Sequence, residues 1–175
     1  AFTASGQEIP GGMPTDLQPL PEPREAAPFR AALTKAADEM KLTTIDPAAV
    51  SDAVLREWSW DYDWYGKKEY PDERPGGPDA ETLRREVFDA QALVEASDDG
   101  PLGAVLRRTG ALLNHLSATG AVREDLAADY RRILETPRPS RDSEAYQRMY
   151  LAACAVRRQV ALGNPLLDFD DLLFV

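Results

Sequence analysis

Apolar side chains recur every three or four residues through most of this chain, and this spacing constrains the fold more than any other feature. The clearest stripe begins at Leu102 and ends at Leu116, with Arg107 and Arg108 lying off it. Strands would instead place apolar residues at every second position. The pattern predicts an all-α domain over residues 29–163, an irregular bundle of five or six helices.

Proline, glycine and capping residues divide this region into the expected helices. Asp46-Pro47 predicts a helix start, because aspartate caps free N–H groups and proline suits the first turn. We expect that helix to run towards Trp58, and a third helix to begin near Asp79 and to end before residues 98–101. The last three helices are expected to end at Thr119-Gly120, before Pro137 and at Gly163, with the sixth starting within Ser140 to Ser143.

Helical spacing also predicts which side chains of the last two helices face the core. The expected inward residues are Val122, Leu126, Tyr130, Ile133, Leu134, Tyr146, Met149, Tyr150, Ala153, Val156 and Val160. The same spacing places three arginines of the sixth helix, Arg148, Arg157 and Arg158, on its outer side.

The two ends of the chain differ from the helical middle. Residues 1–28 are rich in proline and glycine, which favours an extended arm over a helix or a central strand. That arm is either a disordered leader or a segment pinned on the domain by its few apolar side chains. Residues 164–175 end in Leu-Leu-Phe-Val, which is typical of a strand that needs a neighbour.

We therefore interpret residues 164–175 as a linker and the start of a following domain. The expected interdomain contacts are Asp168, Phe169, Leu172, Leu173, Phe174 and Val175.

Charge and composition exclude several functions. The formal net charge is −10, which argues against nucleic acid or an anionic membrane as the main partner, because both need a basic surface. No apolar run approaches the ~20 residues of a membrane-spanning helix. With one cysteine and one histidine, the chain has no internal disulfide and no CxxC or CxxCH motif, and most zinc sites are excluded. We predict no cofactor and no metal.

An aromatic and acidic segment, residues 58–70, is the main candidate site. It belongs to a stretch of about twenty residues, from Trp58 to Pro78, that lacks a helical stripe and is expected to form a long loop. The residues expected to bind a ligand are Trp58, Trp60, Asp61, Asp63, Trp64 and Tyr65. Aromatic faces beside carboxylates can stack on sugar rings and bond their hydroxyls; the alternative is that the rings anchor the loop to the bundle or to a neighbouring domain. The segment does not match a calcium loop.

No residue is predicted to be catalytic. His115 is isolated and is expected at a helix surface or boundary, and Cys154 is expected to be a small buried hydrophobe because alanines surround it. The acidic residues Asp168, Asp170 and Asp171 form either a metal or carboxylate site or, as favoured here, a solvated or arginine-paired cluster.

Residues 150–175 resemble a junction in a known family. An arginine-rich helix leads there into the run NPLLDFDDLLFV, a pattern similar to one in large extracytoplasmic planctomycete-type proteins related to the hydrazine synthase alpha subunit. The resemblance implies a helical N-terminal region placed before a β-propeller-like domain, in the periplasm or outside the cell. It implies no haem or redox role here, because the CxxCH motifs of the synthase are absent.

Together these observations predict a non-catalytic helical accessory domain that docks on a propeller-like domain of its own chain or on a protein partner. The alternative is a carbohydrate-binding or carbohydrate-processing module that uses the aromatic and acidic segment.

Overall fold

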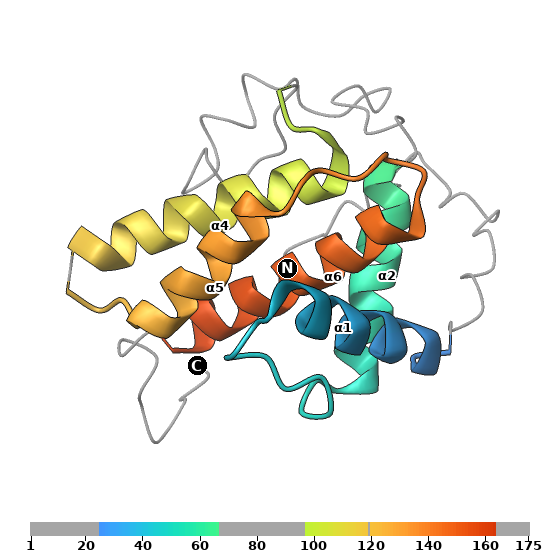
Figure 1. Cartoon of the computed structure of the whole chain (residues 1–175), viewed down its shortest axis with the longest axis horizontal. Helices are drawn as coiled ribbons and strands as arrows, with labels where there is room; N and C mark the ends of the chain where they lie inside the picture. Colours follow the sequence, from blue (N-terminus) through green and yellow to red (C-terminus); the bar gives the residue numbers. More distant parts are fainter. Residues whose placement is uncertain (1–24, 67–96, 119, 164–175) are drawn as a thin grey trace, which may run out of the picture.

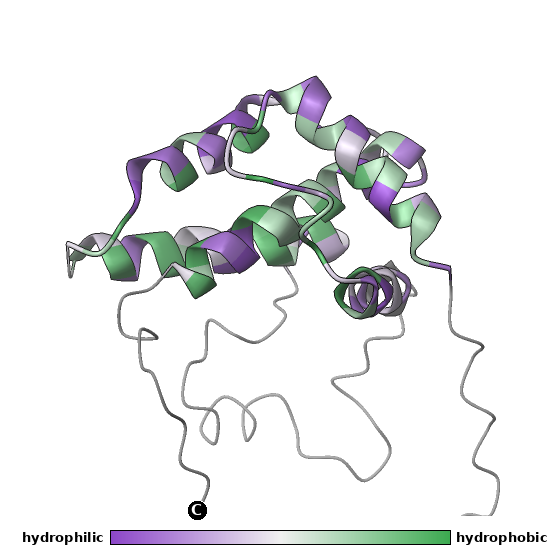
Figure 2. Ribbon diagram, turned by 90° about the horizontal axis from the view of Figure 1, so that it is seen from below, coloured by the Kyte–Doolittle hydropathy of each residue, from purple (hydrophilic) through white to green (hydrophobic). Residues whose placement is uncertain are grey.

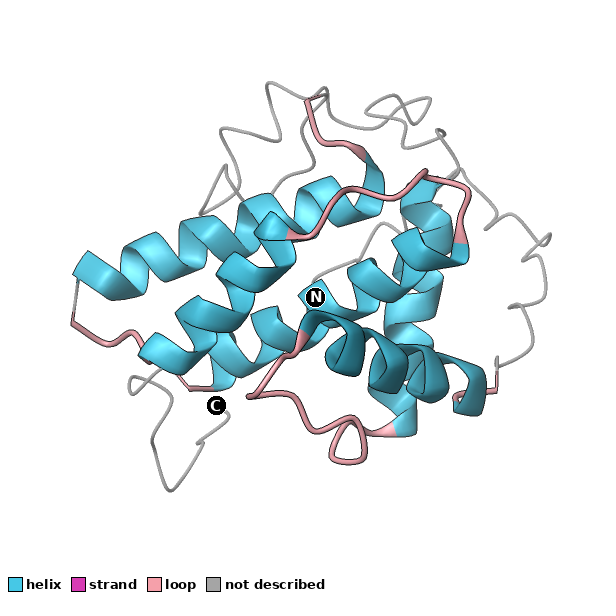
Figure 3. Ribbon diagram, in the orientation of Figure 1, coloured by secondary structure: helices cyan, strands magenta, loops and turns pink. Residues whose placement is uncertain are grey.

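The computed structural model describes residues 25–66, 97–118 and 120–163, and these residues form helices joined by loops (Figure 1, Figure 3). The helices are α1 (Ala27–Met40), α2 (Asp52–Gly66), α4 (Gly100–Ala118), α5 (Glu124–Glu135) and α6 (Glu144–Leu162). No strand occurs within these three ranges. The predicted all-α fold is confirmed.

Helix α6 is the centre of the bundle. Every residue from Met149 to Val156 is buried, and α6 packs against α1, α2, α4 and α5. Figure 2 shows hydrophilic and hydrophobic residues mixed along each helix, as expected of helices with one apolar side. In α6 the small residues Ala152, Ala153, Cys154 and Ala155 are buried as well, so neighbouring helices approach it from several sides.

Most of the predicted helix ends are correct. Pro28 lies in the first turn of α1, so the helix begins inside the predicted arm of residues 1–28. Helix α4 ends at Ala118, one residue before the predicted break, and α5 ends before Pro137. At the start of α6 the Ser143 hydroxyl accepts a hydrogen bond from the Tyr146 N–H at 3.2 Å.

The prediction that α2 begins at Asp46-Pro47 is wrong. The Asp46 carboxylate accepts a hydrogen bond from the Ala48 N–H at 2.9 Å and stabilises a separate turn. The helix begins at Asp52, where the Ser51 carbonyl accepts the Leu55 N–H at 3.1 Å. Local hydrogen bonding by aspartate thus competes with helix formation at this position.

The prediction that a long loop begins at Trp58 is also wrong over its first part, because α2 continues to Gly66. One side of this helix carries buried Leu55 and Ser59, followed by Tyr62 at the next helical position. The Tyr62 ring centroid lies 5.2 Å from that of Tyr150 and 6.3 Å from that of Tyr146, both in α6. Two of the three inward positions are a serine and a tyrosine instead of aliphatic residues. The helical spacing of this side was therefore not recognisable in the sequence as an apolar stripe.

Two side chains of α5 and α6 lie differently from the sequence prediction. Leu134 was expected inside but is 51% exposed. Arg148 was expected outside, yet its side chain is only 16% exposed and forms ion pairs with Glu39 at 3.4 Å and Glu144 at 3.9 Å. The aliphatic part of arginine can cover apolar surface while its charged end reaches a partner.

Several predictions concern residues outside the described ranges. They are the arm over residues 1–24, the third helix from Asp79, the remainder of the expected loop from residue 67, and residues 164–175 with all six expected interdomain contacts. Within the described ranges, none of the helices is both long and apolar enough to cross a membrane.

Asp129 joins α5 to the loop between α1 and α2. Its carboxylate is fully buried and accepts hydrogen bonds from the Thr43 N–H at 2.9 Å and the Thr44 N–H at 2.8 Å. The Thr44 hydroxyl donates to the same group at 2.6 Å, and Arg132 pairs with it. A buried carboxylate requires such partners, because an unpaired charge is costly in the interior. Asp129 therefore fixes the start of this loop to α5.

We predict that Asp129→Ala lowers the free energy of unfolding by about 2–4 kcal/mol, because it removes a buried carboxylate that accepts hydrogen bonds from the Thr43 and Thr44 N–H groups and pairs with Arg132. Urea unfolding followed by circular dichroism measures the change. Asp125→Ala is the control, because Asp125 is exposed on the same helix. Equal stability of the two variants would contradict the assigned role of Asp129.

We also predict a pH dependence from Asp129. Burial acts to raise the pKa of Asp129, but the hydrogen bonds from Thr44, Thr43 and Arg132 outweigh it and lower that pKa below the usual 3.8. A lowered pKa in the folded state stabilises the protein above pH 3.8, and this contribution is lost as the pH falls through the folded-state value. Unfolding free energies of the wild type should therefore fall more steeply on acidification than those of Asp129→Asn; parallel pH profiles would contradict this.

Candidate functional site

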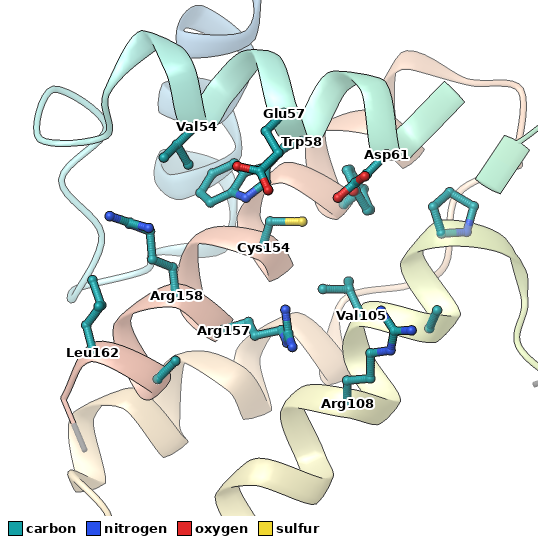
Figure 4. Close-up of a pocket in the computed structure, with 14 residues that line it drawn as sticks. Val54, Glu57, Trp58, Asp61, Val105, Arg108, Cys154, Arg157, Arg158 and Leu162 are labelled. Carbon is teal, nitrogen blue, oxygen red and sulfur yellow. The ribbon is translucent and has the colours of Figure 1, made fainter. Parts of the chain in front are cut away.

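An open pocket of about 280 Å³ lies between α2, α4 and α6 (Figure 4). Its apolar lining includes Trp58 and Leu162, and its charged lining comes from all three helices. The full lining is Val54, Glu57, Trp58, Asp61, Pro101, Ala104, Val105, Arg108, Tyr150, Cys154, Arg157, Arg158, Ala161 and Leu162.

Helix α2 supplies the acidic wall of this pocket. Val54, Glu57, Trp58 and Asp61 are separated by three, one and three residues, which places them on one side of the helix. That side is distinct from the inward side that carries Leu55. Val54 and Trp58 of this side also pack against the core, whereas Glu57 and Asp61 are exposed.

Helices α4 and α6 supply the basic side. Figure 4 shows Arg108 rising from α4, and Arg157 and Arg158 extending from α6. No ion pair within 4.0 Å links Asp61 or Glu57 to these arginines among the described residues. Three positive and two negative side chains thus line the pocket, in a chain whose net charge is −10.

Charged residues on both sides of the pocket influence the pKa of Asp61. Partial removal from water raises the pKa of its carboxyl group, and the negative charge of Glu57 adds to the rise. The positive charges of Arg108 and Arg157 act in the opposite direction without cancelling the rise. Charges of both signs therefore act on this carboxyl group.

Cys154 lies at the pocket lining but is buried, with 7% of its surface exposed. Burial raises the pKa of its thiol to about 12. A thiol is an effective nucleophile only as the thiolate, so this environment suits a packing role. The prediction that Cys154 is a buried small residue is confirmed.

The structure separates the residues that the sequence grouped as a ligand site. Trp58 and Asp61 line the pocket together. Trp60 is 42% exposed and does not belong to the pocket lining, and neither does Asp63. The side chains of Trp64 and Tyr65 lie outside the described part.

Four charged pocket residues were not predicted as site residues: Glu57, Arg108, Arg157 and Arg158. The position of Glu57, four residues before Asp61, was the available signal for the acidic wall. The arginines carried no such signal, because an outward position on an isolated helix looks solvent-exposed until another helix crosses it.

Other predicted candidates lie away from this pocket. His115 is exposed in the last turn of α4, in agreement with the predicted surface position. In the described part of the chain, no group of three histidine, cysteine or acidic residues could hold a metal ion. Asp168, Asp170 and Asp171 fall outside that part.

Comparison with protein-family models, with curated proteins and with solved structures finds no match for this chain. The resemblance of residues 150–175 to the planctomycete-type junction therefore stays a prediction.

We predict that Cys154 in the folded protein reacts slowly with a thiol reagent such as DTNB at pH 8, because burial holds its pKa at about 12. The rate should rise by orders of magnitude in guanidinium chloride, where the thiol is exposed. The absorbance of the released thiolate measures both rates. Rapid reaction in the folded state would contradict the assignment of Cys154 to the packed interior.

Proposed function

We propose that this chain is a non-catalytic helical accessory domain that docks on a protein partner through the outward side of α2. The observation that carries this proposal is Trp60, which is 42% exposed in the middle of α2. Tryptophan is among the residues that contribute most to protein interfaces, because one ring buries a large area at a small entropic cost.

The surroundings of Trp60 suggest the chemistry of the partner. Glu57 and Asp63 lie three residues before and after it, hence on the same side of α2. Arg56 also lies on that side and forms an ion pair with Asp52 at 4.0 Å. With a net charge of −10 in addition, the chain favours a partner that is basic around an apolar recess for the ring.

The family resemblance proposes a specific partner. If residues 150–175 form the junction they resemble, the partner is a β-propeller-like domain in the same polypeptide, and the protein acts in the periplasm or outside the cell.

The carbohydrate hypothesis has one supporting observation. Trp58 shares the pocket with the carboxylates of Glu57 and Asp61, so one aromatic face and two acceptors lie near each other. The tryptophans that the sequence grouped as one sugar-binding surface do not act together here, since Trp58 lines the pocket and Trp60 does not. Carbohydrate binding is therefore the second candidate, and sugars are included among the ligands tested below.

We predict that a photo-cross-linking residue placed at position 60 in the natural full polypeptide joins α2 to a protein partner. The expected product, identified by mass spectrometry, is a peptide of the following domain of the same polypeptide. Position 134 is the matched control, because Leu134 is also exposed and apolar but lies on α5. Similar products from both positions, or none from position 60, would contradict docking through α2.

A further inference from the structure

Apart from Glu57, which borders both, the residues that line the α2/α4/α6 pocket do not belong to the proposed docking side of α2. Its acidic wall carries Glu57 and Asp61, and its basic side carries Arg157 and Arg158. The two sets face one open space of about 280 Å³. We propose that this pocket binds a small zwitterion with an ammonium group and a carboxylate, of the size and type of an apolar α-amino acid.

The positions of the charged side chains are the first argument for a zwitterionic ligand. In the described part of the chain, Asp61 and Arg157 form no ion pair within 4.0 Å, although the positive charge of Arg157 acts on the Asp61 carboxyl group. A ligand with both charges can bridge them, with its ammonium near Asp61 and its carboxylate near Arg157. Arginine suits this role because its planar guanidinium can bind both oxygens of a carboxylate.

Ligands with one charge fit less well. A simple anion would meet the arginines but would also lie near two carboxylates, and a simple cation would meet the reverse conflict. A neutral ligand would interact with neither set of charges as an ion does. The zwitterion is the small ligand whose two charges match both sides of the pocket.

The volume and the apolar lining of the pocket are the second argument, and they favour a small ligand with an apolar side chain. A volume of about 280 Å³ lies just below the ~300–1,000 Å³ usual for sites that hold drug-sized ligands. A smaller ligand is therefore favoured. Val54, Trp58 and Val105 give it an apolar surface to contact, and the indole face can also attract the ammonium group.

The raised pKa of Asp61 is consistent with this site. Removal from water and the charge of Glu57 raise that pKa, and an ammonium group placed beside the carboxylate would lower it again. Ligand binding should thus weaken when the pH falls far enough to protonate Asp61. This pH dependence accompanies the binding test and does not replace it.

The experiment compares three related ligands by isothermal titration calorimetry on the whole chain. L-Phenylalanine has both charged groups, 3-phenylpropionate lacks the ammonium, and phenethylamine lacks the carboxylate. We expect L-phenylalanine, or L-leucine in its place, to bind, and each single-charge analogue to bind at least about tenfold more weakly. Cellobiose and N-acetylglucosamine are included as neutral ligands.

Variants locate the site. Asp61→Asn and Arg157→Gln are each expected to weaken amino-acid binding at least about tenfold, with the same thermal stability as the wild type. Asp38→Asn and Arg131→Gln remove exposed charges of the same types on α1 and α5 and should leave binding unchanged.

Several results would overturn the proposal. They are equal binding of 3-phenylpropionate, saturable binding of a neutral sugar with no binding of amino acids, no binding of either amino acid at millimolar concentration, or equal effects of the pocket and control variants. The proposal does not rest on docking through Trp60: pocket variants should leave the cross-link from position 60 intact, so the two can fail separately.

Discussion

The burial of α6 along its length is the constraint on which the rest of the structure depends. From Met149 to Val156 no residue faces solvent, and the run Ala152 to Ala155 is made of small side chains. Small residues let neighbouring helices approach closely, and close approach supplies many weak contacts that together stabilise the bundle. Four helices can therefore pack around one, and only towards its ends does α6 present charged side chains to solvent.

The pocket follows from this arrangement. Where α6 becomes exposed again, at Arg157 and Arg158, α2 and α4 still lie beside it. The floor of the pocket consists of core residues such as Val105 and Cys154, and the charged side chains of the three helices stand around them. The result is an open, mixed-charge recess beside a rigid centre, and the same helix α2 turns Trp60 towards a different direction. The two proposed binding surfaces therefore lie on different sides of one helix.

Sequence reasoning succeeded where the determining interactions are local. The stripe from Leu102 to Leu116 identified α4, and Ser143 was correctly placed near the start of α6 because a cap bonds within its own turn. The predicted helix start at Asp46 was wrong, because a local turn forms there. The predicted loop from Trp58 was wrong over its first part, because α2 continues to Gly66 without a recognisable apolar stripe. In the second case contacts between Tyr62 and tyrosines of α6 stabilise a helix that its own sequence pattern did not reveal.

The candidate site divides in the same way. Residue types and spacing alone identified Trp58 and Asp61 as candidate binding residues and Cys154 as an inert interior residue, because these properties depend on near neighbours in the chain. Tertiary structure alone decided that Arg108 and Arg157 share a pocket with them and that Trp60 does not. The physical reason is that a helix's own periodicity defines its sides, whereas the angle and position at which helices cross determine which sides meet.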